Sequence, residues 1–192
     1  MTRVAIVDPQ PAVRAGLGML LRTEPGLLPV GAAYGAHDGV ELVERLHPDV
    51  VLLEQHLLDG DGLALCRRLR ALPRAPRIVL YTAEPDVGLG LLARVAGAAG
   101  LIDKAAAPEA LFDAIRVVAR GGTALPPVEP AALDAAAHRV EPDDLALLAM
   151  LVDNTPPADV AEALRLDARR LSRRTERLLG RLRARATTSA AA

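Results

Sequence analysis

The chain has few side chains that could bind a metal through sulfur or imidazole. It contains one cysteine, Cys66, among 192 residues, which excludes an intrachain disulfide and offers no metal-binding spacing. The four histidines are scattered without the spacing of metal ligands: His37, His47, His56 and His138. The sequence therefore predicts no metal site.

Long apolar runs are also missing. No uninterrupted apolar segment reaches the roughly 18 to 20 residues that span a bilayer, and no leader with charged, apolar and small-residue parts opens the chain. Residues 8–11, after the first expected strand, lack the G-x-G-x-x-G pattern of a dinucleotide site. We therefore expect a cytoplasmic protein that is not an enzyme, binds no cofactor and has no membrane partner.

The formal net charge of −1 conceals an asymmetry along the chain. Residues 1–120 carry 13 basic and 14 acidic side chains, residues 121–164 carry 1 and 8, and residues 165–192 carry 9 and 2. The last segment therefore has a formal charge of +7, from nine minus two. Positive charge concentrated in one terminal element indicates a polyanionic partner for that element.

Residues 1–120 alternate short apolar runs with helical periodicity, which is typical of β/α units around a parallel sheet. Helix faces are marked by apolar spacings such as Leu17 with Leu21 and Leu111 with Ile115. The strands are expected near residues 3–7, 28–33, 49–54, 77–81 and 100–103. Five strands and five helices predict a flavodoxin-like (βα)5 domain of the α/β class, and the remaining residues suffice for a small all-α domain.

The segment 121–139 is rich in proline and alanine and is expected to be a linker, with Gly121-Gly122 ending the last helix before it. Helical periodicity resumes over residues 140–185 and predicts three short helices. Asn154 is expected to end the first, Pro156-Pro157 to open the second and Asp167 to cap the third. Residues 186–192 are expected to form a disordered tail.

Four polar side chains follow strands of the expected sheet: Asp8, Glu54, Thr82 and Lys104. The carboxyl ends of parallel strands meet at one edge, and ligands collect at that edge in open α/β sheets. These four side chains therefore outline one candidate site.

Residues 49–62, which read DVVLLEQHLLDGDG, resemble the strand and loop of the receiver domain of two-component response regulators. In that family an aspartate at this strand end accepts a phosphoryl group, and Glu54 stands in its place here. Thr82 and Lys104 match the family's hydroxyl and lysine. The resemblance implies that these residues and Asp8 form an altered phosphoacceptor pocket.

The departures from the family concern the chemistry of phosphorylation. The acidic pair that holds Mg²⁺ in the family survives only as Asp8, because Pro9 replaces its second member. Leu58 stands where a proline is usual, and Leu101 stands where an aromatic switch residue is usual. Hard cations such as Mg²⁺ need well-placed oxygen ligands, so a weakened cation site is expected.

Glu54 itself carries one methylene more than aspartate, which moves its carboxylate by about 1.5 Å. Ordinary phosphorylation is therefore not expected. Two interpretations stay open. In one, Glu54 reaches Lys104 or Thr82 and imitates the phosphorylated charge; in the other, the pocket has decayed into a charge cluster that stabilises the strand ends.

The region from Val140 to about Arg183 resembles, without gaps, the LuxR-type helix-turn-helix output domain of NarL/FixJ response regulators. Glu141-Pro142 stands where the family has threonine-proline, residues 160–164 match its second-helix core, and Asp167 caps its recognition helix. The resemblance implies that the third helix binds double-stranded DNA.

Arginine suits such a helix because its fork pairs with guanine and its charge displaces condensed cations. The second helix departs from the family at Ala158 and Asp159, where basic or amide residues are usual. The alternative is that the third helix packs only within the protein and that its arginines simply face solvent. The residues that the resemblance assigns to base edges are Ser172, Arg173 and Glu176, and those assigned to phosphates are Arg169, Arg170, Arg174, Arg177 and Arg181.

Residues 87–101 contain one charged side chain, Arg94, and four glycines. An exposed helix so poor in polar groups normally has a partner that covers it, and the corresponding face of receiver domains commonly pairs two subunits. We therefore predict a homodimer through this surface, which would also suit the reading of paired DNA half-sites. The alternative is that small residues let the helix pack close to the sheet.

Together these features resemble an atypical NarL/FixJ response regulator and predict a DNA-binding transcriptional regulator that works independently of aspartyl phosphorylation. One alternative is a protein-interaction module, in which a receiver-like dimer without DNA affinity titrates another regulator. Another is a receiver that senses a small molecule in the altered pocket. The partner at the receiver-like domain, a small ligand or a protein, is left open.

Overall fold

The structure is a computed structural model that describes residues 1–83, 85 and 88–184. By packing it divides into two units: unit 1 comprises residues 1–85 and 98–125, and unit 2 comprises residues 86–97 and 126–192. The expected tail at 186–192 and Val87, the first residue of the predicted apolar stretch, lie outside the described residues. Within the described ranges, no helix is long and apolar enough to cross a bilayer.

Unit 1 is built on a parallel sheet with the strand order β2-β1-β3-β6-β7. All four residues of β3 are buried, because helices cover both faces of a parallel sheet. The edge strand β2 contains Pro29, beside an irregular register with β1. The sheet confirms the predicted flavodoxin-like fold. Its strands are β1 (Thr2–Val7), β2 (Leu27–Ala33), β3 (Val50–Leu53), β6 (Arg77–Thr82) and β7 (Gly100–Asp103).

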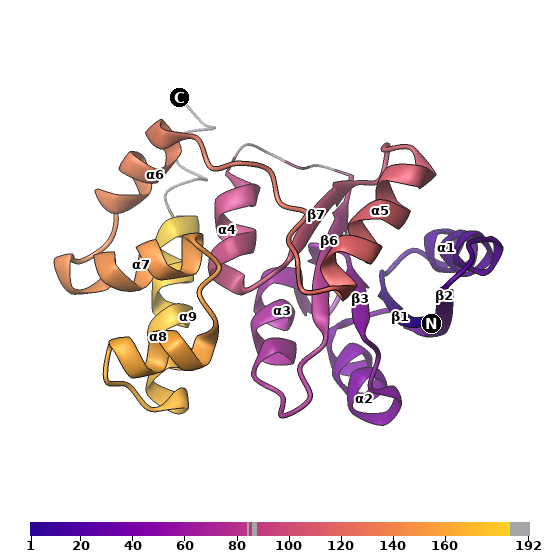
Figure 1. Cartoon of the computed structure of the whole chain (residues 1–192), viewed down its shortest axis with the longest axis horizontal. Helices are drawn as coiled ribbons and strands as arrows, with labels where there is room; N and C mark the ends of the chain where they lie inside the picture. Colours follow the sequence, from indigo (N-terminus) through magenta and orange to yellow (C-terminus); the bar gives the residue numbers. More distant parts are fainter. Residues whose placement is uncertain (84, 86–87, 185–192) are drawn as a thin grey trace. The chain divides into compact units, whose positions relative to one another are not determined.

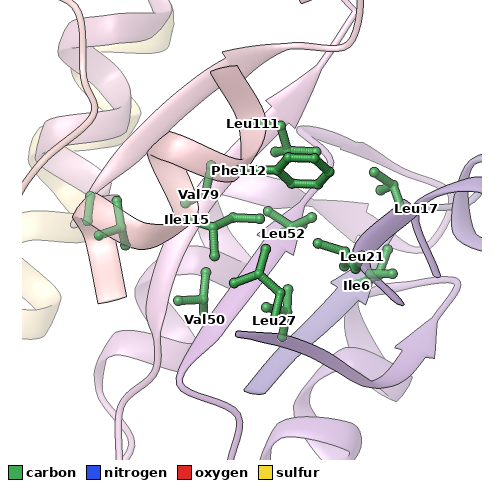
Figure 2. Close-up of a cluster of buried hydrophobic side chains, with 13 residues drawn as sticks. Ile6, Leu17, Leu21, Leu27, Val50, Leu52, Val79, Leu111, Phe112 and Ile115 are labelled. Carbon is green, nitrogen blue, oxygen red and sulfur yellow. The ribbon is translucent and has the colours of Figure 1, made fainter. Parts of the chain in front are cut away.

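Helices α1 (Pro11–Thr23) and α5 (Pro108–Ala119) share one face of this sheet. Leu17 and Leu21 of α1 and Phe112 and Ile115 of α5 belong to one buried cluster with Leu52 of β3, as Figure 2 shows. The other two helices of unit 1, α2 (Ala36–Leu46) and α3 (Gly62–Arg70), contact each other and the sheet on its opposite side (Figure 1).

A short hairpin that was not predicted follows β3. It pairs β4 (His56–Leu57) with β5 (Gly60–Asp61) in antiparallel register. The loop that carries the family resemblance is therefore structured, and it begins two residues after Glu54.

Unit 2 is helical. The three helices predicted for its C-terminal part are confirmed as α7, α8 and α9. Asn154 adopts a positive φ of 54° just beyond α7, and the Asp167 carboxylate accepts the backbone N–H of Arg170 at 2.7 Å, as a cap does. The described helices are α4 (Leu89–Ala96), α6 (Pro130–Ala137), the 3₁₀ helix η1 (Pro142–Asp144), α7 (Leu145–Val152), α8 (Pro157–Ala163) and α9 (Ala168–Ala184).

The segment 121–139, expected to be a linker, contains helix α6. Pro130 occupies its first turn, where a missing N–H costs nothing, and the alanines that follow favour the helical state. The prolines that indicated a stiff linker therefore indicate, in part, where a helix begins.

Helix α4 lies between β6 and β7 in the chain, yet it packs with the C-terminal helices. It contacts α7 and α9 within unit 2. Arg94 donates to the carbonyl oxygens of Pro126 at 2.8 Å and Val152 at 3.4 Å, and a Cβ on Gly90 would lie 3.0 Å from the Pro126 ring. The apolar stretch that predicted a homodimer thus has a covering partner within the same chain.

Candidate functional site

The four predicted pocket residues meet at the carboxyl edge of the sheet. The strand order reverses between β1 and β3, because the chain passes from β1 outward to β2 and then returns to the other side of β1. Asp8 follows β1 and Glu54 follows β3, so these two carboxylates flank the position where doubly wound sheets bind ligands. Thr82 ends β6, and Lys104 follows β7.

Lys104, the only lysine of the chain, joins the two carboxylates. Its Nζ lies 2.6 Å from Asp8 Oδ2 and 2.6 Å from Glu54 Oε2. The residues Asp8, Glu54 and Thr82 are all buried, and the Lys104 side chain is 13% exposed. We call this group of four residues the pocket.

The remaining carboxylate oxygens of the pocket are also hydrogen-bonded. Asp8 Oδ1 accepts the backbone N–H of Gln10 at 2.8 Å, and Glu54 Oε1 accepts the backbone N–H of His56 at 3.1 Å. The Thr82 side chain hydrogen-bonds to Glu54 as well. Buried charges with satisfied hydrogen bonds are the arrangement that a protein interior tolerates.

These contacts shift the pKa values of Glu54 and Lys104 away from neutrality. Burial alone would raise the pKa of Glu54, but hydrogen bonds from Lys104 and the His56 amide, the charge of Lys104 and the Thr82 hydroxyl together lower it below its ordinary value. Burial alone would lower the pKa of Lys104, but the Asp8 and Glu54 carboxylates raise it. Both groups therefore stay charged at neutral pH.

The residues present do not fit the Mg²⁺ that the family resemblance implies. Mg²⁺ requires several oxygen ligands in near-octahedral geometry, whereas an ammonium group already lies within 2.6 Å of both carboxylates. Pro9 offers no side-chain oxygen. The described residues also contain no cluster of three or more acidic, histidine or cysteine side chains arranged for a metal.

The loop after Glu54 is held by its own backbone. The Gly62 N–H donates to the Gln55 carbonyl at 2.7 Å, and a Cβ on Gly62 would lie 2.2 Å from the Glu54 carbonyl oxygen. Only glycine fits there. Asp59 at the hairpin turn accepts the backbone N–H groups of Ala36 at 2.7 Å and His37 at 3.1 Å, so it caps α2.

The predicted DNA-binding residues all lie on α9, where they divide into two groups. The apolar stripe of the helix is buried as predicted, through Leu171, Thr175, Leu178 and Leu182. Six of the predicted DNA-binding side chains are exposed on the helix surface: Arg169, Arg170, Ser172, Arg173, Glu176 and Arg177.

The other two, Arg174 and Arg181, are partly buried and point to carboxylates of their own unit. Arg174 Nε lies 2.5 Å from Asp144 Oδ1, and Arg181 lies 2.5 Å from Glu141 Oε1 and 3.5 Å from Asp144 Oδ2. These acidic partners were not predicted as part of the site. The sequence did contain a signal for such partners, because residues 121–164 carry eight acidic side chains and only one basic side chain.

Comparisons with known proteins assign the family. The family model described as the response regulator receiver domain matches residues 4–116. The chain therefore belongs to the response regulator receiver family.

Several curated relatives extend the likeness beyond that domain. The DNA-binding transcriptional activator DevR/DosR of Mycobacterium tuberculosis is 32% identical over all of this chain and 93% of its own length. The nitrate/nitrite response regulator NarL of Escherichia coli is 33% identical over 73% of this chain and 67% of that relative. The match to the transcriptional regulatory protein YxjL of Bacillus subtilis, at 34% identity, covers 62% of this chain and 55% of YxjL.

Solved structures agree with this assignment. A two-component response regulator of the LuxR family from Aurantimonas superimposes with a TM-score of 0.62 at 30% identity, over 73% of this chain and 99% of that one. RcsB of Salmonella typhimurium, at 18% identity and a TM-score of 0.63, covers 95% of this chain and 93% of its own. At that identity the likeness concerns the fold alone.

Proposed function

We propose that this chain is a DNA-binding transcriptional regulator whose receiver domain works without aspartyl phosphorylation. The observation that carries the proposal is the bridging position of Lys104, bound at 2.6 Å to both Asp8 and Glu54. Lys104 and Thr82, the groups that would bind a phosphoryl group, already form hydrogen bonds with the Glu54 carboxylate.

The chemistry of the pocket disfavours phosphoryl transfer. A transferred phosphoryl group needs a positioned acceptor and a cation that neutralises its charge. Glu54 displaces the acceptor oxygen by about 1.5 Å relative to aspartate, and each of its two oxygens already has a donor, Lys104 at Oε2 and the His56 amide at Oε1. The ammonium group of Lys104 lies at 2.6 Å from the carboxylates of both Asp8 and Glu54, the side chains that would otherwise hold a cation.

The contacts of Glu54 agree with both interpretations of this residue. Imitation of a phosphorylated charge requires Glu54 to reach Lys104 or Thr82, and it reaches both. The ion pairs of Lys104 with Asp8 and Glu54 also form the charge cluster of the other interpretation. A Glu54→Gln substitution separates the two interpretations because it removes the negative charge and keeps the size. Imitation predicts weaker DNA binding by the variant, whereas a decayed pocket predicts unchanged DNA binding with lower stability.

DNA binding is proposed from α9 and from the relatives. Six predicted contact residues are exposed on one helix, four of them arginines, and arginine is the commonest side chain for reading guanine. The relatives DevR/DosR and NarL are a DNA-binding activator and a response regulator. Arg173 is the residue that we assign to base reading, and Arg169, Arg170 and Arg177 are assigned to phosphates.

A homodimer remains part of the proposal because of the paired DNA half-sites, and the apolar stretch no longer supports it. Because α4 is covered within unit 2 by α7 and α9, its apolar residues no longer require a second subunit. Paired half-sites on DNA still favour a twofold protein. Light scattering at about 100 µM, with and without a selected DNA site, measures the oligomeric state directly.

The decisive experiment is selection of genomic DNA fragments by the purified, unphosphorylated protein near physiological salt. Arg173→Ala is the test variant, and Arg22→Ala, an exposed arginine on α1, is the matched control. Recovery of a shared inverted repeat by the native protein and the control, but not by Arg173→Ala, is expected. Failure of the native protein to enrich any site contradicts the proposal and favours a protein-interaction module.

Treatment with acetyl phosphate tests the independence from phosphorylation. No incorporation at Glu54 and an unchanged selected site are expected. Efficient labelling of Glu54, or DNA binding that appears only after treatment, contradicts the proposed mode of action while leaving DNA recognition intact.

A further inference from the structure

Three carboxylates lie within four residues beside α9. Glu141, Asp143 and Asp144 form and flank the 3₁₀ helix η1, and we call them the acid turn. Asp144 is buried, with 6% of its surface exposed, whereas Glu141 and Asp143 are exposed. The acid turn thus combines one interior carboxylate with two that face solvent.

The buried carboxylate anchors two arginines of α9. Asp144 binds Arg174 at 2.5 Å through Oδ1 and lies 3.5 Å from Arg181 through Oδ2. Arg174 also donates to the backbone carbonyl of Asp143, and Arg181 is held from its other side by Glu141 at 2.5 Å. The acid turn therefore holds two of the five arginines that the sequence assigned to DNA phosphates. A third, Arg170, pairs with Asp167 at 3.3 Å, outside the acid turn.

A hollow of about 680 Å³ lies between the acid turn and α9. The acid turn lines one part of it, and Arg170, Arg173 and Arg177 line another. A nucleic-acid strand that approaches the exposed arginines therefore brings its phosphates close to the Glu141 and Asp143 carboxylates. Like charges brought together in this way oppose binding.

We propose that the acid turn is a specificity-determining element, which competes with DNA phosphates for the arginines of α9 and thereby suppresses sequence-independent binding. This inference rests on the proposed DNA-binding function. Binding through phosphates gains its free energy from the release of condensed cations by each arginine. An arginine that must first leave a carboxylate gains less, whereas hydrogen bonds to base edges in the groove are unaffected.

The order of charges in the chain fits this role. Residues 121–164 carry one basic and eight acidic side chains directly before the segment with nine basic and two acidic ones. Arginines in such number attract the phosphates of a duplex whatever its sequence. The acid turn lowers that background, so the few side chains that read bases contribute a larger share of the discrimination.

The test is the double substitution Glu141→Gln with Asp143→Asn, which removes the two exposed charges and leaves the buried Asp144 in place. The matched control is Asp134→Asn with Asp153→Asn. It changes the net charge equally within the same unit, and neither residue lines the hollow. Affinity for the selected DNA site and for a scrambled duplex is titrated at several salt concentrations, and the salt needed to elute each protein from heparin is recorded.

The expected result is a gain of about tenfold in affinity for the scrambled duplex, with a log–log salt slope steeper by about 1. The gain for the selected site should be smaller, so the ratio of specific to non-specific affinity falls. Heparin elution should move to higher salt in the test variant only. An equal change in the control, or no change in the test variant, overturns the inference.

Heparin separates this inference from the proposed function, because it presents negative charge without a base sequence. If no protein selects a DNA site but the test variant alone binds heparin more tightly, the competition between acid turn and polyanion stands and the proposed DNA function fails. If the native protein selects its site and both double variants behave alike, the DNA function stands and the competition fails.

Discussion

The pocket of unit 1 and the acid turn of unit 2 join acidic and basic side chains at different depths. In the pocket, Asp8 and Glu54 are buried around a lysine that is 13% exposed. In the acid turn only Asp144 is buried, and Glu141 has 63% of its side chain in solvent. Buried ion pairs are costly to break, whereas exposed ones exchange readily with solvent ions. We therefore regard the pocket as fixed and the outer part of the acid turn as exchangeable.

Removing the cation of the pocket should have the largest effect. Lys104→Met leaves two buried carboxylates without a counter-charge, and we expect a loss of about 3–5 kcal/mol in the free energy of unfolding. Urea unfolding measures it, with Arg45→Met, an exposed residue of α2, as the control. The triple substitution of Asp8→Asn, Glu54→Gln and Lys104→Met should recover part of the loss, because no charge is then left unpaired.

A substitution in the pocket loop tests whether the backbone also fixes the pocket. Gly62→Ala brings a Cβ to 2.2 Å from the Glu54 carbonyl, and we expect it to cost about 2–3 kcal/mol, as overpacking does. The control is Gly16→Ala on α1, where nothing lies within 4 Å of the added Cβ. That change should stabilise the protein by about 0.5–1 kcal/mol. Equal urea midpoints for the two variants would contradict the close contact.

Within the acid turn, a substitution of the buried Asp144 should lower stability more than a substitution of the exposed Glu141. Asp144→Asn weakens the partner of Arg174 in a buried position and should cost about 1–2 kcal/mol. Glu141→Gln removes an exposed pair and should cost under about 1 kcal/mol, an effect that disappears in about 1 M salt, where the Debye length is about 3 Å. If both variants lost stability equally at all salt concentrations, the distinction between fixed and exchangeable pairs would be wrong.

The pH dependence of stability should be the smallest effect near neutrality. The lowered pKa of Glu54 contributes stability above its ordinary value of 4.5, and this is lost as the pH falls through the folded pKa. The raised pKa of Lys104 contributes stability below 10.5, and this is lost as the pH rises through its folded pKa. Melting curves of the native protein and the triple variant should therefore differ by a constant amount between these limits and converge outside them.

The sequence predicted where the pocket residues lie because parallel strands end at a common edge, and Asp8, Glu54, Thr82 and Lys104 each follow a strand. It did not predict that one ammonium group binds both carboxylates at equal distance. That contact depends on the lengths of three side chains that are far apart in the chain, and no local pattern encodes it.

In unit 2, too, local features were predicted from the sequence and contacts between distant residues were not. Periodicity predicted α7, α8 and α9 and even the capping residue Asp167, since caps and apolar stripes are local signals. The partners of Arg174 and Arg181 are about 30 to 40 positions away in sequence, and their assignment to DNA followed the spacing of a family. Helix α6 was missed because prolines both stiffen linkers and begin helices.

The packing of α4 bears on how this protein can be taken apart and recombined. Its residues, Leu89–Ala96, are encoded inside the receiver segment, but they fold against α7 and α9. A chimera that joins residues 126–192 to a different receiver would leave behind the helix on which the output helices rest. The transferable module of this chain is therefore discontinuous, and a functional graft has to carry the surface of α4 together with the C-terminal helices.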